Sequence, residues 1–114
     1  MKAIYDKTGS LINTIKGSKY YENYQQCLFQ LKKEKETYKE FNQFRKQYFD
    51  MTQTGEDNFA EIEKLQQKFH ETLSNASVVD FMEAEDQMCL ILKDMYIMIA
   101  EQLQFDMDFI EEEQ

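Results

Sequence analysis

The sequence predicts an all-α protein: a bundle of about five helices that ends in one long helix. Three observations support this class. The 114-residue chain has no proline and only 3 glycines, whereas a small β-fold needs turn residues at each strand junction. Hydrophobic residues make up 42% of the chain, enough for a packed core, although 31% of residues are charged. The apolar residues recur at spacings of three and four, which places them on one face of a helix.

We expect a single domain over residues 1–114, because no linker or internal repeat divides the chain and its length is typical of one domain. No apolar run approaches the roughly 18 residues that cross a bilayer, and the N-terminus lacks the pattern of a signal peptide. We therefore expect a cytoplasmic protein without a membrane segment. Cys27 and Cys89 are then most simply buried, reduced thiols.

The first expected helix is short. Its apolar stripe consists of Ile4, Thr8, Leu11 and Ile15. Gly9 inside it costs about 1 kcal/mol relative to alanine, so this helix must be stabilised by packing. Gly17 suits the left-handed position after a helix end, and Ser18 suits the N-cap of the next helix.

A second helix is expected from about Lys19 to Lys32, and a third from about Lys35 to Thr52. The apolar stripe of the second is Tyr20, Tyr24, Cys27, Leu28 and Leu31. That of the third is Tyr38, Phe41, Phe44, Tyr48 and Met51. The intervening KKEKE segment contains no helix breaker, so the sequence leaves open whether these are two helices or one bent rod.

Gln53 to Asp57, with Gly55, is the clearest turn in the chain. A fourth helix follows from about Asn58. Its inward residues are expected to be Phe59, Ile62, Leu65, Phe69 and Leu73. A softer break follows at residues 75–77, where Ser77 and Asp80 have the spacing of a capping box.

The fifth helix, from Ser77 to Ile110, is expected to be the central element. Its main stripe is Val78, Phe81, Met82, Met88, Leu92, Met95, Tyr96, Ile99 and Leu103. A second series widens this face: Ala84, Ile91, Met98 and Phe105. A helix that is apolar over so much of its circumference contacts several neighbours or a second subunit. We therefore expect a homodimer or higher oligomer, with this interface: Met88, Leu92, Met95, Tyr96, Ile99 and Leu103.

Glu85 is the one carboxylate near the middle of this stripe, and a buried carboxylate is costly unless it is paired. The simplest interpretation is an internal polar contact with Arg45 or with a lysine of the second or third helix, or a side chain reaching out at the stripe's edge. The alternative is a polar contact that sets the register across a dimer.

The net charge of -9 is unevenly distributed. Residues 1–57 carry ten Lys or Arg and eight Asp or Glu, whereas residues 58–114 carry three and fourteen. The acidic half could face a basic protein surface or the chain's own first half, but a solvated surface is the simplest interpretation. Because the chain is acidic overall, we expect no direct nucleic-acid binding.

The residues that catalysis or metal binding would need are missing from the pattern. His70 is the only histidine, and a lone histidine on an acidic amphipathic helix is usually a surface residue. The three glycines are isolated, so no phosphate loop is formed. Residues 106–111 begin like a calcium loop but lack its glycine. We therefore expect no enzyme activity, no catalytic residue, no cofactor and no metal.

Basic and aromatic residues alternate in the second and third helices, a mixture that stacks on single-stranded nucleic acid in some proteins. The residues are Lys19, Tyr20, Tyr21, Tyr24, Lys39, Phe41, Phe44, Arg45, Lys46 and Tyr48. Helical spacing favours a packed core with basic side chains reaching outward. An accessory factor that contacts RNA through this Lys/Tyr-rich face is the alternative hypothesis.

The segment FMEAEDQMCLILKDMYIMIAEQL, residues 81–103, resembles the bacterial YlbF/YmcA (YheA-like) family, with an apolar-Met-x-Ala-Glu core at Met82, Ala84 and Glu85. The upstream order is similar too: a short helix ending in Gly17-Ser18, a Tyr-rich helix, and then Phe-x-x-Phe-Arg at residues 41–45. The similarity covers nearly the whole chain and consists of packing patterns rather than catalytic motifs.

This resemblance implies a small, all-helical, oligomeric cytosolic protein of the kind typical of Gram-positive bacteria. Relatives regulate competence, biofilm formation and sporulation, and some join a complex that directs the endoribonuclease RNase Y and carries an iron–sulfur cluster. Those relatives have cysteines in a C-terminal extension, and with two cysteines here we expect no cluster. The resemblance thus implies a regulator that binds other proteins.

Overall fold

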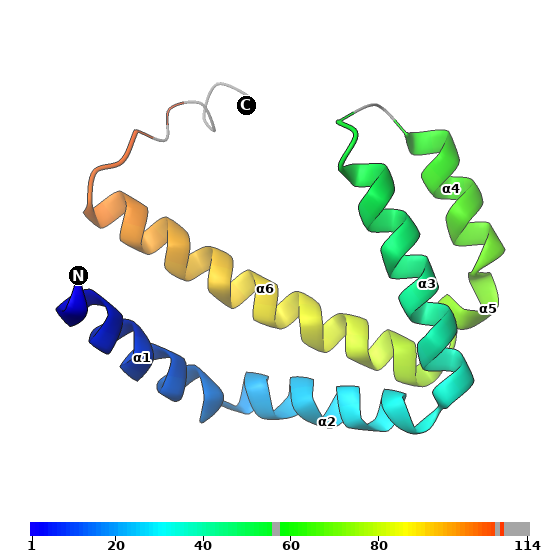
Figure 1. Ribbon diagram of the computed structural model, residues 1–114, viewed down its shortest axis with the longest axis horizontal. Helices are drawn as coiled ribbons and strands as arrows, with labels where there is room; N and C mark the ends of the chain where they lie inside the picture. The colour runs from blue at the N-terminus through cyan, green and yellow to red at the C-terminus, as the bar shows by residue number, and fades with distance from the viewer. Residues whose placement is uncertain (56–57, 107, 109–114) are drawn as a thin grey trace.

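The computed structural model describes residues 1–55, 58–106 and 108, and within them it contains six helices and no strand (Figure 1). The helices are α1 (Lys2–Lys16), α2 (Lys19–Lys33), α3 (Lys35–Thr52), α4 (Phe59–Lys68), α5 (His70–Leu73) and α6 (Ala76–Gln102). The prediction of an all-α protein with a long C-terminal helix is confirmed.

The helices form two arms that meet at a corner (Figure 1). One arm consists of α2 packed along α6, with α1 continuing outward from the start of α2; the other is the hairpin of α3 and α4. The Cα radius of gyration is 17.8 Å, whereas a compact domain of this length has one of about 13 Å. The chain alone is therefore unusually open, and a large fraction of each arm faces solvent.

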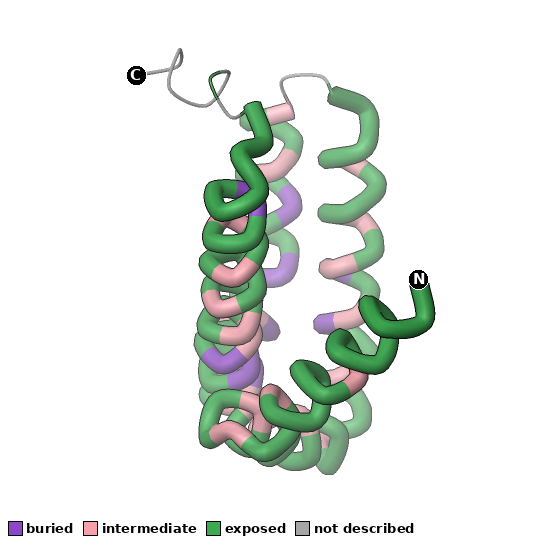
Figure 2. Tube along the Cα trace, turned by 90° about the vertical axis from the view of Figure 1, so that its left-hand side faces the viewer, coloured by how far each residue is buried: buried purple, intermediate pink, exposed green. Residues whose placement is uncertain are grey.

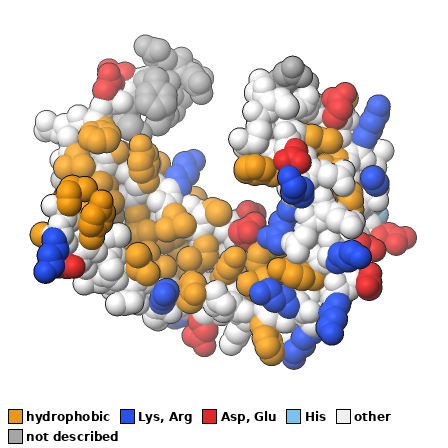
Figure 3. All heavy atoms as spheres, viewed as in Figure 1, with side chains coloured by type: hydrophobic (Ala, Val, Ile, Leu, Met, Phe, Trp, Pro, Cys, Tyr) orange, Lys and Arg blue, Asp and Glu red, His pale blue; other side chains and the backbone are white. Residues whose placement is uncertain are grey.

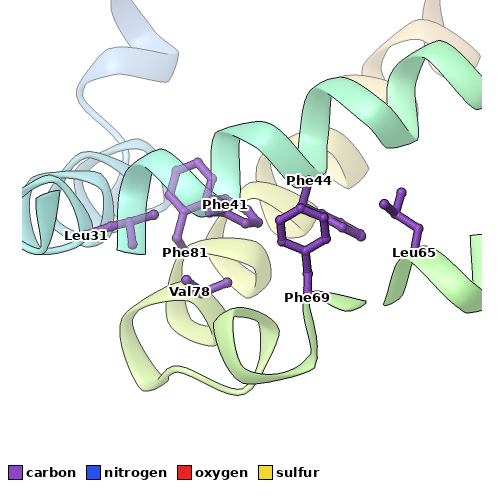
Figure 4. Close-up of a cluster of buried hydrophobic side chains, with 7 residues drawn as sticks. All are labelled: Leu31, Phe41, Phe44, Leu65, Phe69, Val78 and Phe81. Atoms are coloured by element: carbon purple, nitrogen blue, oxygen red, sulfur yellow. The ribbon is translucent and has the colours of Figure 1, made fainter. Parts of the chain in front are cut away.

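The core lies at the corner, where helices from both arms meet (Figure 4). Its buried residues are Leu31, Phe41, Phe44, Leu65, Phe69, Val78 and Phe81. The rings of Phe41 and Phe81 meet edge-on with centroids 5.9 Å apart, and those of Phe44 and Phe69 do so at 5.7 Å. Such pairs add to the hydrophobic contribution of burial. The core thus fixes the corner but does not extend to the ends of the arms.

The question left open by the KKEKE segment has a clear answer: α2 and α3 are separate helices that meet at Glu34 (φ -90°, ψ 76°). Asn75 Nδ2 donates a hydrogen bond to Glu34 Oε1 at 3.0 Å. Hydrogen bonds from the Ser77 and Asn75 side chains lower the pKa of the Glu34 carboxyl. The bend is therefore held by a contact 41 residues away in the chain, which no local pattern reveals.

The same Asn75 is the N-cap of α6, and the prediction of Ser77 as that cap is wrong. Asn75 Oδ1 accepts hydrogen bonds from the backbone N–H groups of Ser77 and Val78, at 2.9 and 3.2 Å. Asparagine is as good an N-cap as serine, so the helix begins at Ala76, earlier than the predicted capping box. The predicted cap of α2 is confirmed, since Ser18 Oγ accepts from the Tyr21 N–H at 3.3 Å.

The single fourth helix expected after Asn58 is interrupted at Phe69 (φ -102°, ψ 21°), which separates α4 from the one-turn α5. Phe69 is buried in the core, so packing rather than a breaker residue sets this kink. Phe59, expected to point inward, is 73% exposed because α4 begins far from the corner. Gly55 adopts φ +70° in the predicted turn; residues 56 and 57 lie outside the described part.

The α6 helix ends at Gln102, and residues 103–106 are not helical, so the prediction of one helix continuing to Ile110 is wrong. Residues 107, 109 and 110 of the predicted helix lie outside the described part. The Phe105 N–H bonds to the Ala100 carbonyl at 2.9 Å, and the Gln104 N–H to the Glu101 carbonyl at 3.0 Å. This is a Schellman motif, with Gln104 in the left-handed region at φ 59°. Gly17, expected to be left-handed, has an ordinary φ of -86°.

Candidate interaction surface

One apolar face of α6 passes from buried to exposed along the helix. Val78 and Phe81 are fully buried at the corner. Four residues continue the same face: Leu92, Tyr96, Ile99 and Leu103, which we call the exposed stripe. At 3.6 residues per turn, all four lie within about 60° of the direction of Phe81. Their exposed fractions are 49%, 60%, 52% and 63%, so the face that builds the core continues for about three turns with only partial cover.

The exposed stripe is only partly covered because the neighbouring helices leave α6. Figure 2 shows α1 diverging from the C-terminal half of α6, and Figure 1 shows the α3–α4 arm rising away from it. In the space-filling view, hydrophobic side chains gather over α1 and α6, and an open notch separates α6 from the other arm (Figure 3). Monomeric proteins rarely expose large contiguous apolar patches, so this surface is a candidate contact site.

The first helix adds to this surface, since none of its 15 residues is buried. The exposed apolar residues of α1 and its N-cap are Met1, Ile4, Tyr5, Leu11 and Ile12. The sequence indicated that α1 needs packing, but the main contact that the structure gives α1 is its junction with α2. The apolar spacing of α1 was visible in the sequence; what the sequence could not show is that this face points away from the chain's own core.

The structure places the six predicted interface residues of α6 in two groups. Met88 and Met95 are half-buried, and the other four form the exposed stripe. The polar contact predicted between Arg45 and Glu85 is present in the structure: Arg45 Nη1 lies 3.8 Å from Glu85 Oε2. The contact connects α3 with α6 within one chain, which is the simpler of the two interpretations considered for Glu85.

The guanidinium of Arg45 also lies over two aromatic rings of the core. Its guanidinium carbon lies 4.6 Å from the centroid of Phe41 and 5.4 Å from that of Phe81, distances at which cation–π attraction operates. Burial and, next, the charge of Glu85 raise the pKa of Tyr24, which packs against Phe81 with ring centroids 5.3 Å apart. Arg45, Glu85 and Tyr24 therefore form a polar cluster at the edge of the core, where the two arms diverge.

The reactive side chains are not gathered into a site. His70 begins α5 and is exposed. Cys89 is exposed and Cys27 is half-buried, so the expectation that both thiols are buried is wrong. Burial, and then the carboxylates of Asp80 and Glu83, raise the pKa of the Cys27 thiol, which disfavours the nucleophilic thiolate. Among residues 1–55, 58–106 and 108, no group of three or more His, Cys, Asp or Glu side chains is placed to hold a metal ion. Within the same ranges, no helix has the length and apolarity needed to span a membrane.

The Lys/Tyr-rich face of α2 and α3 is divided by the fold. Phe41 and Phe44 belong to the core and Tyr24 packs against it, so these aromatics are not available for base stacking. Lys46 pairs with Asp50 at 3.2 Å. The clearest exposed aromatic–cation pair lies outside that set, where Lys33 Nζ is 4.6 Å from the centroid of the exposed Phe29 ring.

Fold and surface together define a small all-helical protein that presents an apolar helix face to its surroundings. A family model described as "Control of competence regulator ComK, YlbF/YmcA" matches residues 4–104, from α1 to the end of α6. The chain therefore belongs to the YlbF/YmcA family, and the resemblance stated from the sequence is confirmed. No curated protein and no solved structure matched the chain.

Proposed function

We propose that this chain is a non-enzymatic regulatory protein that acts in the cytoplasm by binding proteins, first of all a second copy of itself. The observation that supports this proposal is the exposed stripe, which continues the core face of α6 into solvent. The family match, whose description names a competence regulator, supports a regulatory role. A further protein partner would then recognise the assembled oligomer rather than the isolated chain.

The magnitudes are consistent with assembly. Fully burying a large apolar side chain contributes about 1.5–3 kcal/mol. Because roughly half of each side chain in the exposed stripe is still exposed, covering the four contributes about 3–7 kcal/mol. Association costs on the order of 4–15 kcal/mol in lost translational and rotational freedom. The exposed stripe alone therefore reaches only the lower end of this cost, and additional contact area is needed for a tight oligomer.

Non-enzymatic action is supported by the dispersal of the reactive groups. His70, Cys27 and Cys89 lie on three different helices, α5, α2 and α6. The raised pKa of Cys27 keeps that thiol protonated at neutral pH. A nucleophile without an adjacent base is poorly activated. The dispersal of these reactive groups therefore favours a binding function over catalysis.

The test is a pair of matched substitutions on α6. Leu92 belongs to the exposed stripe, whereas Leu90 is equally apolar and 59% exposed but lies on the opposite side of the helix. Leu92→Asp should convert an oligomer to monomers in light scattering after gel filtration, because it places an unpaired charge in the contact. Leu90→Asp should leave the assembly intact. Equal behaviour of the two variants would refute the proposed surface.

An RNA-contacting accessory role is the second candidate. It is favoured by the pair of Lys33 and the exposed Phe29, and opposed by the net charge of -9. We expect no shift of single-stranded RNA in a gel at low salt. If a shift appears, Lys33→Glu combined with Lys39→Glu should abolish it, while Lys93→Glu on α6 should not; binding that survives the double substitution would exclude this face.

A further inference from the structure

Helix α1 is too exposed to be stable on what its own chain supplies. It has 15 residues and no buried side chain, and isolated helices of about 12–15 residues are marginal in water. Gly9 weakens it further. The hydroxyls of Thr8, Ser10 and Thr14 bond back to the carbonyls four residues earlier, a pattern that slightly destabilises helices. A cover for its apolar face is therefore required.

The C-terminal half of α6 has the complementary requirement. The exposed stripe runs from Leu92 to Leu103 and is about 17 Å long, and α1 is about 22 Å long at 1.5 Å per residue. Helix α1 is therefore long enough to cover the whole exposed stripe. The chain's own α1 does not cover the exposed stripe, because α1 diverges from α6 in Figure 2 and the four stripe residues remain about half or more exposed.

The charges of the two elements are opposite. Helix α1 carries three lysines and one aspartate, together with the N-terminal amino group of Met1. Residues 92–108 carry Lys93 against four carboxylates: Asp94, Glu101, Asp106 and Asp108. In the described part of the chain, none of these charged groups forms an ion pair. Antiparallel packing would place the basic start of α1 beside the acidic end of α6 and align the two helix dipoles favourably.

We propose that the occupant of the exposed stripe is α1 of a second copy, and that each copy gives its α1 and receives that of the other. This proposal rests on the self-association proposed above and specifies its contact. The exchange is two-fold symmetric and closes as a dimer, since each chain presents both complementary surfaces. Pairing of α6 with α6 would leave α1 uncovered and bring two acidic segments together.

Disulfide trapping between two differently marked copies tests this geometry. Cys27→Ala and Cys89→Ser remove the native thiols. One copy then carries Ile4→Cys or Leu11→Cys, and the other, made longer by a tag, carries Leu92→Cys or Ile99→Cys. Mixed in a glutathione redox buffer, at least one of the four combinations should give a mixed-size disulfide dimer as the main product. Leu90→Cys on the opposite side of α6 is the control and should give none.

Each other outcome overturns the proposal in a distinguishable way. Same-size dimers of the α6 variants alone would mean that α6 pairs with α6, which leaves the proposed function standing. If the chain forms oligomers but none of the four combinations gives a disulfide, α1 of a second copy is excluded as the occupant of the exposed stripe. A chain carrying Leu11→Cys and Ile99→Cys that closes an internal disulfide and remains a monomer would show α1 folding back on its own α6. A monomeric parent chain would end both proposals.

Discussion

Arg45 Nη1 lies 3.8 Å from Glu85 Oε2, and the same guanidinium rests over the rings of Phe41 and Phe81. The contact joins α3 to α6 at the point where the two arms separate. Both side chains are more than a third exposed, so solvent screens their ionic attraction. The packing of the arginine on two core rings is therefore the larger part of what this residue contributes.

The first prediction separates these two parts of the Arg45 contact. Glu85→Gln should reduce the free energy of unfolding by less than about 1 kcal/mol, whereas Arg45→Ala should reduce it by about 1–2 kcal/mol because it also removes the stacking. Urea denaturation measures both, and Lys46→Ala in the exposed Lys46–Asp50 pair is the control. A larger loss for Glu85→Gln than for Arg45→Ala would contradict this division.

The second prediction concerns the aromatic centre of the corner. Phe81 is fully buried and contacts the rings of Tyr24 and Phe41. Phe81→Ala should lower the free energy of unfolding by about 3–5 kcal/mol, which leaves a small domain near its unfolding threshold. Leu90→Ala on the exposed side of the same helix should change it by no more than about 0.5 kcal/mol. Similar losses for both would mean that the corner is not the core.

The third prediction follows from the lowered pKa of Glu34, whose ordinary value is 4.5. A carboxyl with a depressed folded-state pKa stabilises the fold above its ordinary value and loses that contribution as the pH falls through the folded-state value. Wild type should therefore exceed Glu34→Gln in stability at about pH 6, and the difference should disappear on acidification below 4.5. Urea titrations at several pH values measure this difference in the free energy of unfolding. A difference that grows as the pH falls would contradict the prediction.

The fourth prediction uses the end of α6. Gln104 adopts φ 59°, a conformation that costs a residue with a side chain roughly 1–2 kcal/mol. Part of the gain from glycine is lost to its greater freedom in the unfolded chain, so Gln104→Gly should raise stability by about 0.5–1 kcal/mol. Gln102→Gly, at the last residue of the helix, should lower it instead. Thermal unfolding followed by circular dichroism would show opposite shifts in Tm.

The sequence predicted what depends on local periodicity. The bounds of α2 and α3 agree within one residue, because their apolar stripes repeat cleanly and Ser18 is a strong cap. Sequence-based prediction failed where contacts between distant residues determine the local structure. The kink at Phe69 is set by core packing, and the bend at Glu34 by Asn75. Exposure of Phe59 likewise depends on how far α4 starts from the corner.

The candidate surface shows the same division. The spacing of Leu92, Tyr96 and Ile99 placed them on one face of α6, and the structure has them there. Spacing alone does not tell which end of that face is covered, because cover depends on where α1 and α3 point after the corner. That information lies in the angles between helices, which short loops leave undetermined by sequence.

Sedimentation equilibrium of the unmodified chain tests the central claim most directly, which is that α6 carries a surface built for contact with a second copy. The chain has a mass of 13.8 kDa. At micromolar concentrations we expect a weight-average mass of twice that value or more, falling towards the monomer on dilution. A mass equal to that of one chain at every concentration, with helicity intact, would contradict the claim.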